Sequence, residues 1–273
     1  MKFGFITCVQ LGLSCMKTFY HSGGELDLAI TLPDNKNINK SGRVYIDDFC
    51  KKYDINLIKN SHINNKEVIE TIRKIDLDWL FIIGWSQIAS QDLLNSPKKG
   101  VIGIHPTLLP QGRGRASIPW SIIKNLKKTG VTMFKMNTEV DSGPIIAQIE
   151  IPLNNKITAT TLYKKVNDAH SQLIKKTTQS ILHGKLKLTP QDHSKATIWP
   201  RRKLEDGEIN LKGSVYEAEN LVRAVTHPYP GAYFYLNGKK HTVWSAKIIK
   251  EHDSDFNKNK IIKFYDGDLL ILN

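Results

Sequence analysis

The chain has 273 residues, of which 40% are hydrophobic and 24% are charged, and its mean hydropathy is -0.32. This composition is typical of a globular protein with a sizeable core and a smaller appendage, and no run approaches the roughly 20 apolar residues of a membrane span. The net charge of +13 comes largely from lysines scattered along the chain rather than from one basic stripe, so we expect a solvated surface and no nucleic-acid partner.

Segments with strand and helix character alternate along the first part of the chain. The predicted strands are 3–7, 26–32, 55–58, 79–83 and 101–104, and the predicted helices are 11–20, 43–52, 66–74 and 91–94. A further strand is predicted at 130–136 and a long amphipathic helix at 158–182. Strands separated by helices of this length form right-handed βαβ units. The predicted fold class is therefore α/β, with a doubly wound, mostly parallel, Rossmann-like sheet.

The first 20 residues are apolar enough to suggest a signal peptide, but polar residues interrupt them and no small-residue cleavage site follows. We interpret them as the first strand and helix. The three cysteines, Cys8, Cys15 and Cys50, have neither metal-binding spacing nor a disulfide framework. They predict reduced thiols and a cytoplasmic location, and we expect neither a metal site nor membrane association.

The segment after the strand at 101–104 carries the strongest chemical signal. His105 leaves this strand into a loop with two prolines, and Asp141 lies 36 residues later beside a glycine turn. If the strand at 130–136 runs parallel, both residues reach the carboxyl edge of the sheet, where ligands bind in open α/β folds. Asp141 could then orient the His105 imidazole for proton transfer. The alternative is a buried histidine satisfied by a backbone carbonyl, with an unrelated turn aspartate.

These residues resemble the folate-dependent formyltransferases, which carry an Asn-x-His-x-Ser-Leu-Leu-Pro loop, an Arg-Gly pair and an Asp-x-Gly loop. The matching residues here are His105, Thr107 in the place of the serine, Leu108, Leu109, Pro110, Arg113, Gly114, Asp141, Ser142 and Gly143. The resemblance implies transfer of a formyl group from the cosubstrate N10-formyltetrahydrofolate, with His105 and Asp141 as catalytic residues.

One position departs from the family pattern. Gly103 stands where the family has an asparagine whose amide is believed to help hold the formyl oxygen. A glycine has no side chain for this role, so the resemblance implies a substitute donor, such as Ser86, Gln87 or a backbone N–H, or else a slow or inactive enzyme.

The remainder of the chain resembles the carboxyl-terminal domain of the same family. A polar linker is predicted at 187–195, followed by a helix at 215–225, short strands and an Asn237-Gly238 hairpin turn. The family landmarks here are Pro200-Arg201-Arg202, Glu205-Asp206-Gly207, Arg223-Ala224 and the segment 228–232. We therefore predict a catalytic domain at 1–190 and a small β-rich carboxyl-terminal domain at 197–273.

The same edge of the sheet supplies the expected binding residues. We expect the folate to lie between the loops that follow 79–83 and 130–136, because Gly84 allows close approach of backbone groups that hydrogen-bond to the pterin. The folate set is Gly84, Trp85, Ser86, Gln87, Ile88, Leu109, Arg113, Asn137, Glu139 and Val140. Trp85 could instead be a core aromatic residue.

The expected acceptor site combines cationic, aromatic and flexible residues. Its predicted members are Gln10, Gly12, Lys40, Arg43, Tyr45, Thr107 and Arg115. An arginine that pairs with pyrophosphate and an aromatic ring that stacks on a base suit a sugar nucleotide. For residues 40–45, a solvated loop and helix start is the alternative.

The compact carboxyl-terminal part resembles that of the sugar N-formyltransferases. Within the family we expect the acceptor to be a nucleotide-linked amino-dideoxy sugar, of the UDP-4-amino-4,6-dideoxy-N-acetyl-altrosamine (pseudaminic) type. The alternatives are a methionyl-tRNA formyltransferase and a non-catalytic protein that binds folate or a sugar nucleotide. The expected partners are these small molecules, and a homodimer is an open alternative to a monomer.

Overall fold

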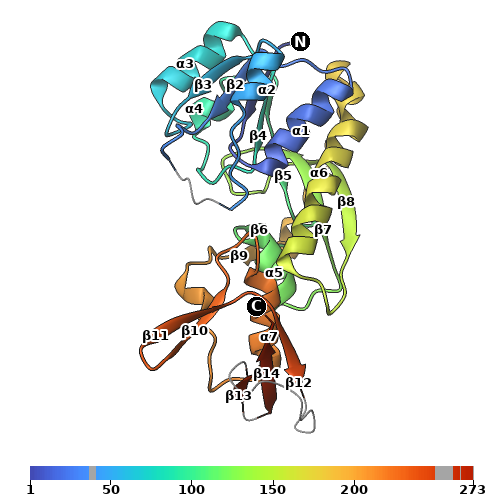
Figure 1. Cartoon of the computed structure of the whole chain (residues 1–273). Helices are drawn as coiled ribbons and strands as arrows, with labels where there is room; N and C mark the ends of the chain where they lie inside the picture. The colour runs from blue at the N-terminus through green and yellow to red at the C-terminus, as the bar shows by residue number, and fades with distance from the viewer. Residues whose placement is uncertain (37–40, 250–260, 265, 273) are drawn as a thin grey trace. The chain divides into compact units, whose positions relative to one another are not determined.

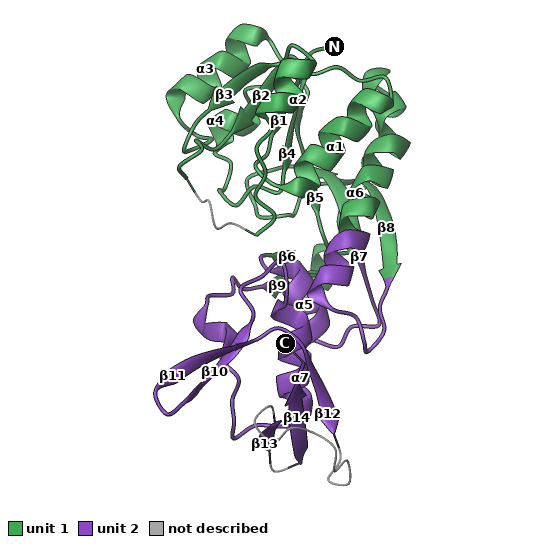
Figure 2. Cartoon of the chain, in the orientation of Figure 1, with its two compact units in different colours: residues 1–114, 130–151, 166–198 green, residues 115–129, 152–165, 199–273 purple. Residues whose placement is uncertain are grey.

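The computed structural model describes residues 1–36, 41–249, 261–264 and 266–272. The chain divides into two compact units, shown in different colours in Figure 2. Unit 1 comprises residues 1–114, 130–151 and 166–198, and unit 2 comprises residues 115–129, 152–165 and 199–273. Two segments of the predicted catalytic domain thus belong to unit 2.

A seven-stranded sheet has the strand order β3-β2-β1-β4-β5-β7-β8 (Figure 1). Its members are β1 (Phe3–Ile6), β2 (Leu28–Thr31), β3 (Asn56–Lys59), β4 (Trp79–Ile83), β5 (Gly100–His105), β7 (Lys128–Lys135) and β8 (Ile145–Pro152). The five strands from β1 to β5 pair parallel with one another. This arrangement confirms the predicted doubly wound, mostly parallel α/β sheet.

Helices cover both faces of this sheet, as strands that are buried at every position require. On one face, α3 (Lys66–Ile75) and α4 (Gln91–Leu94) bury a cluster that includes Ile6, Leu80 and Ile82. On the other face, Phe19 of α1 (Gln10–His21) packs edge-to-face against two strand aromatics, Phe3 and Phe81. The end of the long helix α6 (Ala159–Leu182) also reaches the sheet, where the Thr177 hydroxyl contacts the sulfur of Met133.

β7 does not run in the parallel direction considered for it. β7 pairs antiparallel with β5, so that Lys135 lies opposite Ile102 and Thr132 lies opposite His105. The sequence left the direction of this strand conditional, because a fully buried strand has the same apolar pattern in either direction. The segment that follows β7 must consequently turn back along β5 to bring Asp141 to His105.

The helix predicted at 43–52 is also shorter than expected. The structure has α2 only at Asp47–Lys52. Residues before it are tied to the end of β1: Arg43 forms an antiparallel bridge with Val9, and the Val44 amide donates to the Cys8 carbonyl at 3.1 Å. This extended pairing excludes a helical backbone at these positions.

Unit 2 contains two helices and the predicted short strands. Within it α5 (Ser117–Ile123) and α7 (Val215–Val225) are neighbours, and the Asn220 amide donates to the Ile123 carbonyl at 3.0 Å. The hairpin β10 (Ala232–Leu236) and β11 (Lys239–Val243) turns at Asn237 and Gly238, whose positive φ angles of 51° and 73° fit the predicted Asn-Gly turn. A second sheet has the order β12 (Ala246–Ile249), β14 (Gly267–Ile271) and β13 (Ile261–Phe264).

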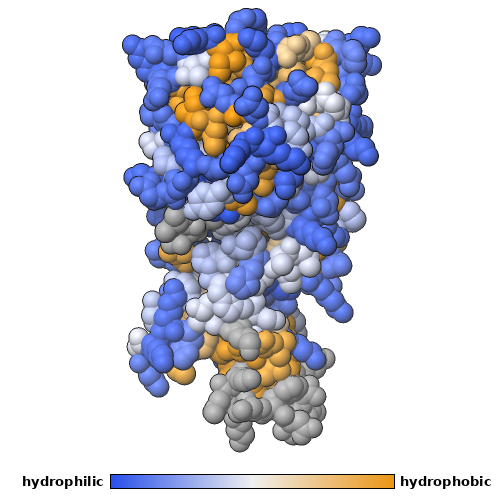
Figure 3. Space-filling view, turned by 45° about the horizontal axis from the view of Figure 1, so that its top comes forward, coloured by the Kyte–Doolittle hydropathy of each residue, from blue (hydrophilic) through white to orange (hydrophobic). Residues whose placement is uncertain are grey.

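Four very short elements complete the described chain: β6 (Arg113–Gly114), β9 (Ile198–Trp199), and 3-10 turns at His193–Lys195 and Glu205–Gly207. Hydrophilic residues cover much of the visible face in the space-filling view, and hydrophobic residues form separate groups on it (Figure 3). Within the described ranges, every helix is too short or too polar to span a bilayer.

Candidate active site

Three adjacent strands bring the predicted site residues to one edge of the sheet. β1, β4 and β5 are neighbours and run parallel, so their carboxyl ends lie side by side. Gln10 follows β1, Gly84 follows β4, and His105 ends β5. The loops expected to bind folate and acceptor therefore begin beside the histidine, as the sequence predicted.

His105 is held between two acceptors. Its side chain is buried, with Nε2 at 2.7 Å from the Gly112 carbonyl oxygen and Nδ1 at 3.4 Å from Asp141 Oδ2. A carbonyl oxygen can only accept, so Nε2 carries the proton in this contact. Nδ1 faces the carboxylate, so the arrangement places a negative charge beside the imidazole.

The Asp141 carboxylate is fixed by backbone as well as by His105. Gly114 N–H donates to Asp141 Oδ2 at 2.9 Å. Asp141 itself adopts a left-handed backbone with φ of 52°, and a Cβ on Gly143 would lie 1.8 Å from the Lys135 carbonyl oxygen. Only glycine fits at 143, so the tight Asp-Ser-Gly turn is what returns the carboxylate to the histidine.

The sequence prediction missed the residues that support this pair. Segment 187–195 was expected to be a linker, yet Gln191 is buried there against the Asp141 turn and Arg113. Just beyond it, the Thr197 hydroxyl accepts from Gly112 N–H at 2.8 Å, and the Thr197 carbonyl accepts from Arg113 N–H at 2.9 Å. Gln191 and Thr197 are uncharged polar residues of a kind common in loops, so their residue types carried no signal for this role.

A second histidine, His170 of α6, is buried and close enough for its electrostatic interaction with His105 to matter. Burial is the main reason that the pKa of His170 falls from 6.5 to about 4, and His105 lowers it further, against a hydrogen bond to the Val166 carbonyl that raises it. His170 is therefore neutral near pH 7. It is not a second proton carrier at the site.

The low pKa of His170 predicts how stability depends on pH. The folded state binds fewer protons than the unfolded state between pH 6.5 and 4, so the free energy of unfolding falls as pH decreases through this window. At about 1.36 kcal/mol per pKa unit, the loss from this one group is about 3 kcal/mol. His170→Leu should flatten this slope in urea unfolding measured from pH 7.5 to 4.5. His183→Leu, an exposed change directly after the same helix, is the matched control, and an unchanged slope in His170→Leu would contradict the assignment.

The expected folate residues line the loops after β4 and β7. The Gln87 side chain accepts from Ile63 N–H and Trp85 Nε1–H and donates to the Ser61 carbonyl, which fixes the Gly84–Ile88 loop. Gly84 has a positive φ of 68°, and its Cβ position is filled by Val9. Ile88 and Val140 are exposed apolar side chains, Ser86 is also exposed, and Trp85 packs partly against the core.

The other members of the folate set have different environments. Leu109 and Arg113 are buried, and Arg113 is occupied by Gln191 and His193. Asn137 and the backbone of Glu139 accept from the Ser142 hydroxyl, which shapes the Asp141 turn.

The expected acceptor residues are less open than their types suggest. The Arg43 guanidinium donates to three backbone carbonyls, those of Val44, Leu32 and Cys8, and lies 4.8 Å from the centre of the Tyr45 ring. Tyr45 is exposed. Arg43 thus connects the loop before α2 to the ends of β1 and β2. That it pairs with a phosphate stays a prediction.

The remaining acceptor residues are dispersed. Gln10 bonds Ser14 in the first turn of α1, and a Cβ on Gly12 would overlap Thr7, so Gly12 serves close packing. Thr107 is buried, with no partner for its hydroxyl among the described residues. Arg115 is exposed and belongs to unit 2, and Lys40 lies outside the described residues.

The place of the family asparagine is filled from the neighbouring strand. Gly103 pairs directly with Phe134 of β7, and a Cβ on Gly103 would lie 3.1 Å from the Phe134 ring and from Met136 Cγ. The aromatic ring covers the glycine, so an asparagine side chain has no room without movement of both neighbours.

Gly103→Asn should therefore lower the free energy of unfolding by about 1–3 kcal/mol, the usual cost of overpacking. Turnover per folded molecule should not rise, since the new amide displaces side chains beside His105. The test is steady-state turnover and chemical unfolding of Gly103→Asn beside the wild type. A large gain in rate would show instead that the chain had merely lost a catalytic group.

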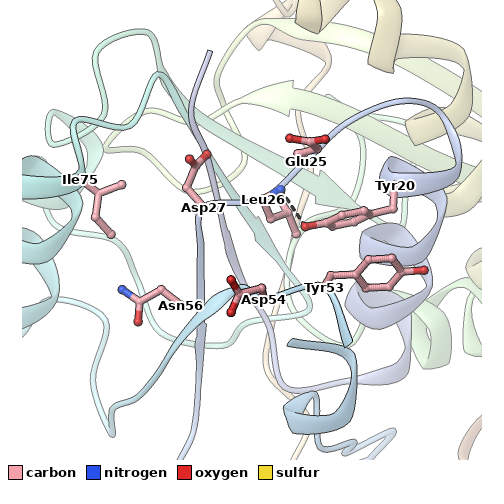
Figure 4. Close-up of a pocket in the computed structure, with 8 residues that line it drawn as sticks. All are labelled: Tyr20, Glu25, Leu26, Asp27, Tyr53, Asp54, Asn56 and Ile75. Atoms are coloured by element: carbon pink, nitrogen blue, oxygen red, sulfur yellow. Dashed lines mark hydrogen bonds between the residues drawn. The ribbon is translucent and has the colours of Figure 1, made fainter. Parts of the chain in front are cut away.

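A hollow of about 630 Å³ lies at the other edge of the sheet. Figure 4 shows Asp27 before β2 and Asp54 and Asn56 at the start of β3, together with Tyr20 and Tyr53. These residues mark the amino ends of the strands, whereas His105 marks a carboxyl end. The hollow is therefore separate from the site.

Comparisons with known proteins identify the family and the fold. The family model described as "Formyl transferase" matches residues 27–178, and "Formyl transferase, C-terminal domain" matches residues 202–273. A 4-N formyltransferase from Francisella tularensis is 25% identical, with a TM-score of 0.69 over 89% of this chain and 96% of that one.

Two further solved structures share the fold at lower identity. The N-formyltransferase of Helicobacter canadensis, in complex with folinic acid and dTDP-3-aminofucose, is 17% identical, with a TM-score of 0.73 over 99% of this chain and 98% of that one. Phosphoribosylglycinamide formyltransferase of Bacillus halodurans is 22% identical, with a TM-score of 0.58 over 67% of this chain and 95% of that one.

Proposed function

The chain belongs to the formyl transferase family, and from that premise we propose that it transfers the formyl group of N10-formyltetrahydrofolate to the amino group of a nucleotide-linked amino-dideoxy sugar. The observation that carries the proposal is the buried His105–Asp141 pair at the carboxyl edge of the sheet, inside the segment that the family model matches. The similarity to sugar N-formyltransferases supports a sugar amine as the acceptor.

In the proposed reaction the neutral sugar amine attacks the formyl carbon. A C–N bond forms to the sugar, the bond from the formyl carbon to folate N10 breaks, and one proton passes from the amine to N10 overall. We assign to His105 the movement of this proton and, when it is protonated, stabilisation of the oxyanion. Both ring nitrogens have protein partners in the structure, so Nε2 must exchange the Gly112 carbonyl for the reacting group, while Asp141 stays beside Nδ1 and stabilises the charged imidazole.

For the acceptor itself, we propose a UDP-linked 4-amino-4,6-dideoxy sugar of the N-acetyl-altrosamine type. The 25% identity to a 4-N formyltransferase supports an amine at carbon 4. A structural relative was solved with a dTDP-linked 3-amino sugar, so the base and the amine position are the two variables to test. We also keep a cytoplasmic location and a homodimer as predictions. The three cysteines, all free and buried, suit a reducing compartment.

The test is to incubate the protein with N10-formyltetrahydrofolate and a panel of UDP- and dTDP-linked 3-amino and 4-amino sugars, with release of tetrahydrofolate followed over time. Formylation of the UDP-4-amino sugar at the highest kcat/KM is the expected result. Formylation of charged initiator tRNA, with strong salt dependence, would favour the tRNA enzyme that the net charge of +13 leaves open.

A second candidate function follows from Gly103. Without the family amide, the chain could bind folate and sugar nucleotide without turnover. Calorimetric binding of both ligands with no formyl transfer to any acceptor in the panel would establish that function in place of the enzyme.

A further inference from the structure

The side-chain amide of Gln191 lies between the two segments that hold His105. Gln191 is 6% exposed, although it belongs to the segment predicted as a linker. Its Nε2 donates to the carbonyl oxygens of Asp141 at 2.8 Å and Gly143 at 2.7 Å. Its Oε1 accepts from Arg113, at 2.8 Å from Nη2 and 3.2 Å from Nε. Both ends of the amide are therefore in use.

The partners of Gln191 lead directly to the two groups that contact the imidazole. Arg113 follows Gly112, whose carbonyl oxygen receives His105 Nε2 at 2.7 Å. Asp141 presents the carboxylate to Nδ1 at 3.4 Å. The Gly114 amide joins the two segments a second time, by donating to Asp141 Oδ2 at 2.9 Å. The contacts form a closed ring in which Gln191 sets the spacing between the Gly112 carbonyl and the Asp141 turn.

The chemistry of this position requires an amide in one orientation. Arg113 only donates, so the amide oxygen must face it, and the NH₂ group must face the two carbonyls. A glutamate would keep the arginine as a partner but place an oxygen against two carbonyl oxygens. A leucine would leave the buried guanidinium of Arg113 without this acceptor. The glutamate variant therefore tests the hydrogen bonds to the Asp141 and Gly143 carbonyls, and the leucine variant tests the loss of these bonds together with the bond to Arg113.

We propose that Gln191 is a positioning residue for the His105–Asp141 pair, an inference that rests on the proposed formyl transfer. It touches no reacting atom. It fixes the Asp141 backbone relative to Gly112, so that the carboxylate and the carbonyl meet the two ring nitrogens together. The Asp141 carboxylate is the charged group that contacts the imidazole, and Gln191 fixes the backbone that positions this carboxylate.

The experiment compares Gln191→Glu and Gln191→Leu with the wild type and with Gln179→Leu. The side-chain amide of Gln179, on α6, donates to the Ser22 carbonyl. Gln179→Leu is therefore the control for losing a glutamine side chain in the same unit. For each protein we would measure kcat, both KM values, the pH profile of kcat, the unfolding midpoint and the ¹⁵N NMR signals of the His105 ring.

Gln191→Glu should lower kcat about tenfold. This is the lower end of the range for residues that orient a functional side chain through hydrogen bonds without contacting the substrate. The KM for the sugar should stay within about twofold, because Gln191 holds none of the expected acceptor residues, whereas the KM for folate should respond through Arg113, a member of the expected folate set. The pH profile of kcat and the His105 ring signals should change, and those of Gln179→Leu should not. Gln191→Leu should show the same changes with a larger loss of stability.

A wild-type kcat, pH profile and ring spectrum in Gln191→Glu would overturn the proposal, including where stability alone has fallen. If Gln191→Leu fails to fold, Gln191→Glu decides. If the wild type transfers no formyl group to any acceptor, the proposed function fails separately, and the ring spectrum still decides: altered His105 signals in Gln191→Glu support positioning, and unchanged signals refute it.

Discussion

Replacing His105 with asparagine should lower kcat by about a hundredfold to ten-thousandfold, the range that a general acid-base group contributes. The fold should survive, because the end of β5 can hold a smaller polar residue, although asparagine is too short to reach the Gly112 carbonyl that His105 Nε2 now contacts at 2.7 Å. What is lost is the group that carries a proton and holds a positive charge beside Asp141. Steady-state turnover with N10-formyltetrahydrofolate and the preferred acceptor measures the effect.

Circular dichroism and an unfolding midpoint would separate lost chemistry from lost structure in His105→Asn. His183→Asn, an exposed histidine change directly after α6, is the control and should retain wild-type turnover. Turnover of His105→Asn within a few-fold of the wild type, with the fold intact, would remove His105 from the proposed mechanism.

Asp141→Asn should lower kcat by about a hundredfold to a thousandfold, with smaller effects on both KM values. The corresponding change in a Ser-His-Asp triad costs about ten-thousandfold. The contact here is longer, at 3.4 Å between Oδ2 and His105 Nδ1, so we expect a smaller loss. The asparagine oxygen can still accept from Gly114 N–H, which preserves the turn but removes the negative charge that stabilises an imidazolium.

The control for Asp141→Asn is Asp168→Asn, which removes one exposed carboxylate from α6. Both variants change the net charge equally, so a shared loss of rate would point to long-range charge. An unchanged kcat in Asp141→Asn would show that the carboxylate only shapes the loop.

Much of the fold could be predicted, because local patterns decide it. Alternation of apolar strands and amphipathic helices gave the parallel order from β1 to β5, and the two prolines after His105 marked the loop at the strand end. The proximity of His105 and Asp141 was expected from topology and is present, even though β7 runs opposite to the direction considered for it. Direction stayed open because a strand buried on both faces carries no directional signal in its residues.

The rest depended on contacts that residue types do not specify. Arg43 could serve a phosphate or a backbone, and the structure shows its guanidinium on three carbonyls. Gln191 sits in a short polar stretch with no periodic pattern, and only the folded chain reveals that its amide is buried between two loops. Such assignments need partners distant in sequence, here 78 residues away in the case of Arg113.

The Phe134 ring over Gly103 has a consequence for the order in which changes at this site can be made. An asparagine at 103 crowds the Phe134 ring. A smaller residue at 134 leaves unfilled space above Gly103. A change at one position should therefore alter the cost of a change at the other. The two positions are neighbours across the strands, so a laboratory selection that seeks the amide at 103 gains by varying both codons together.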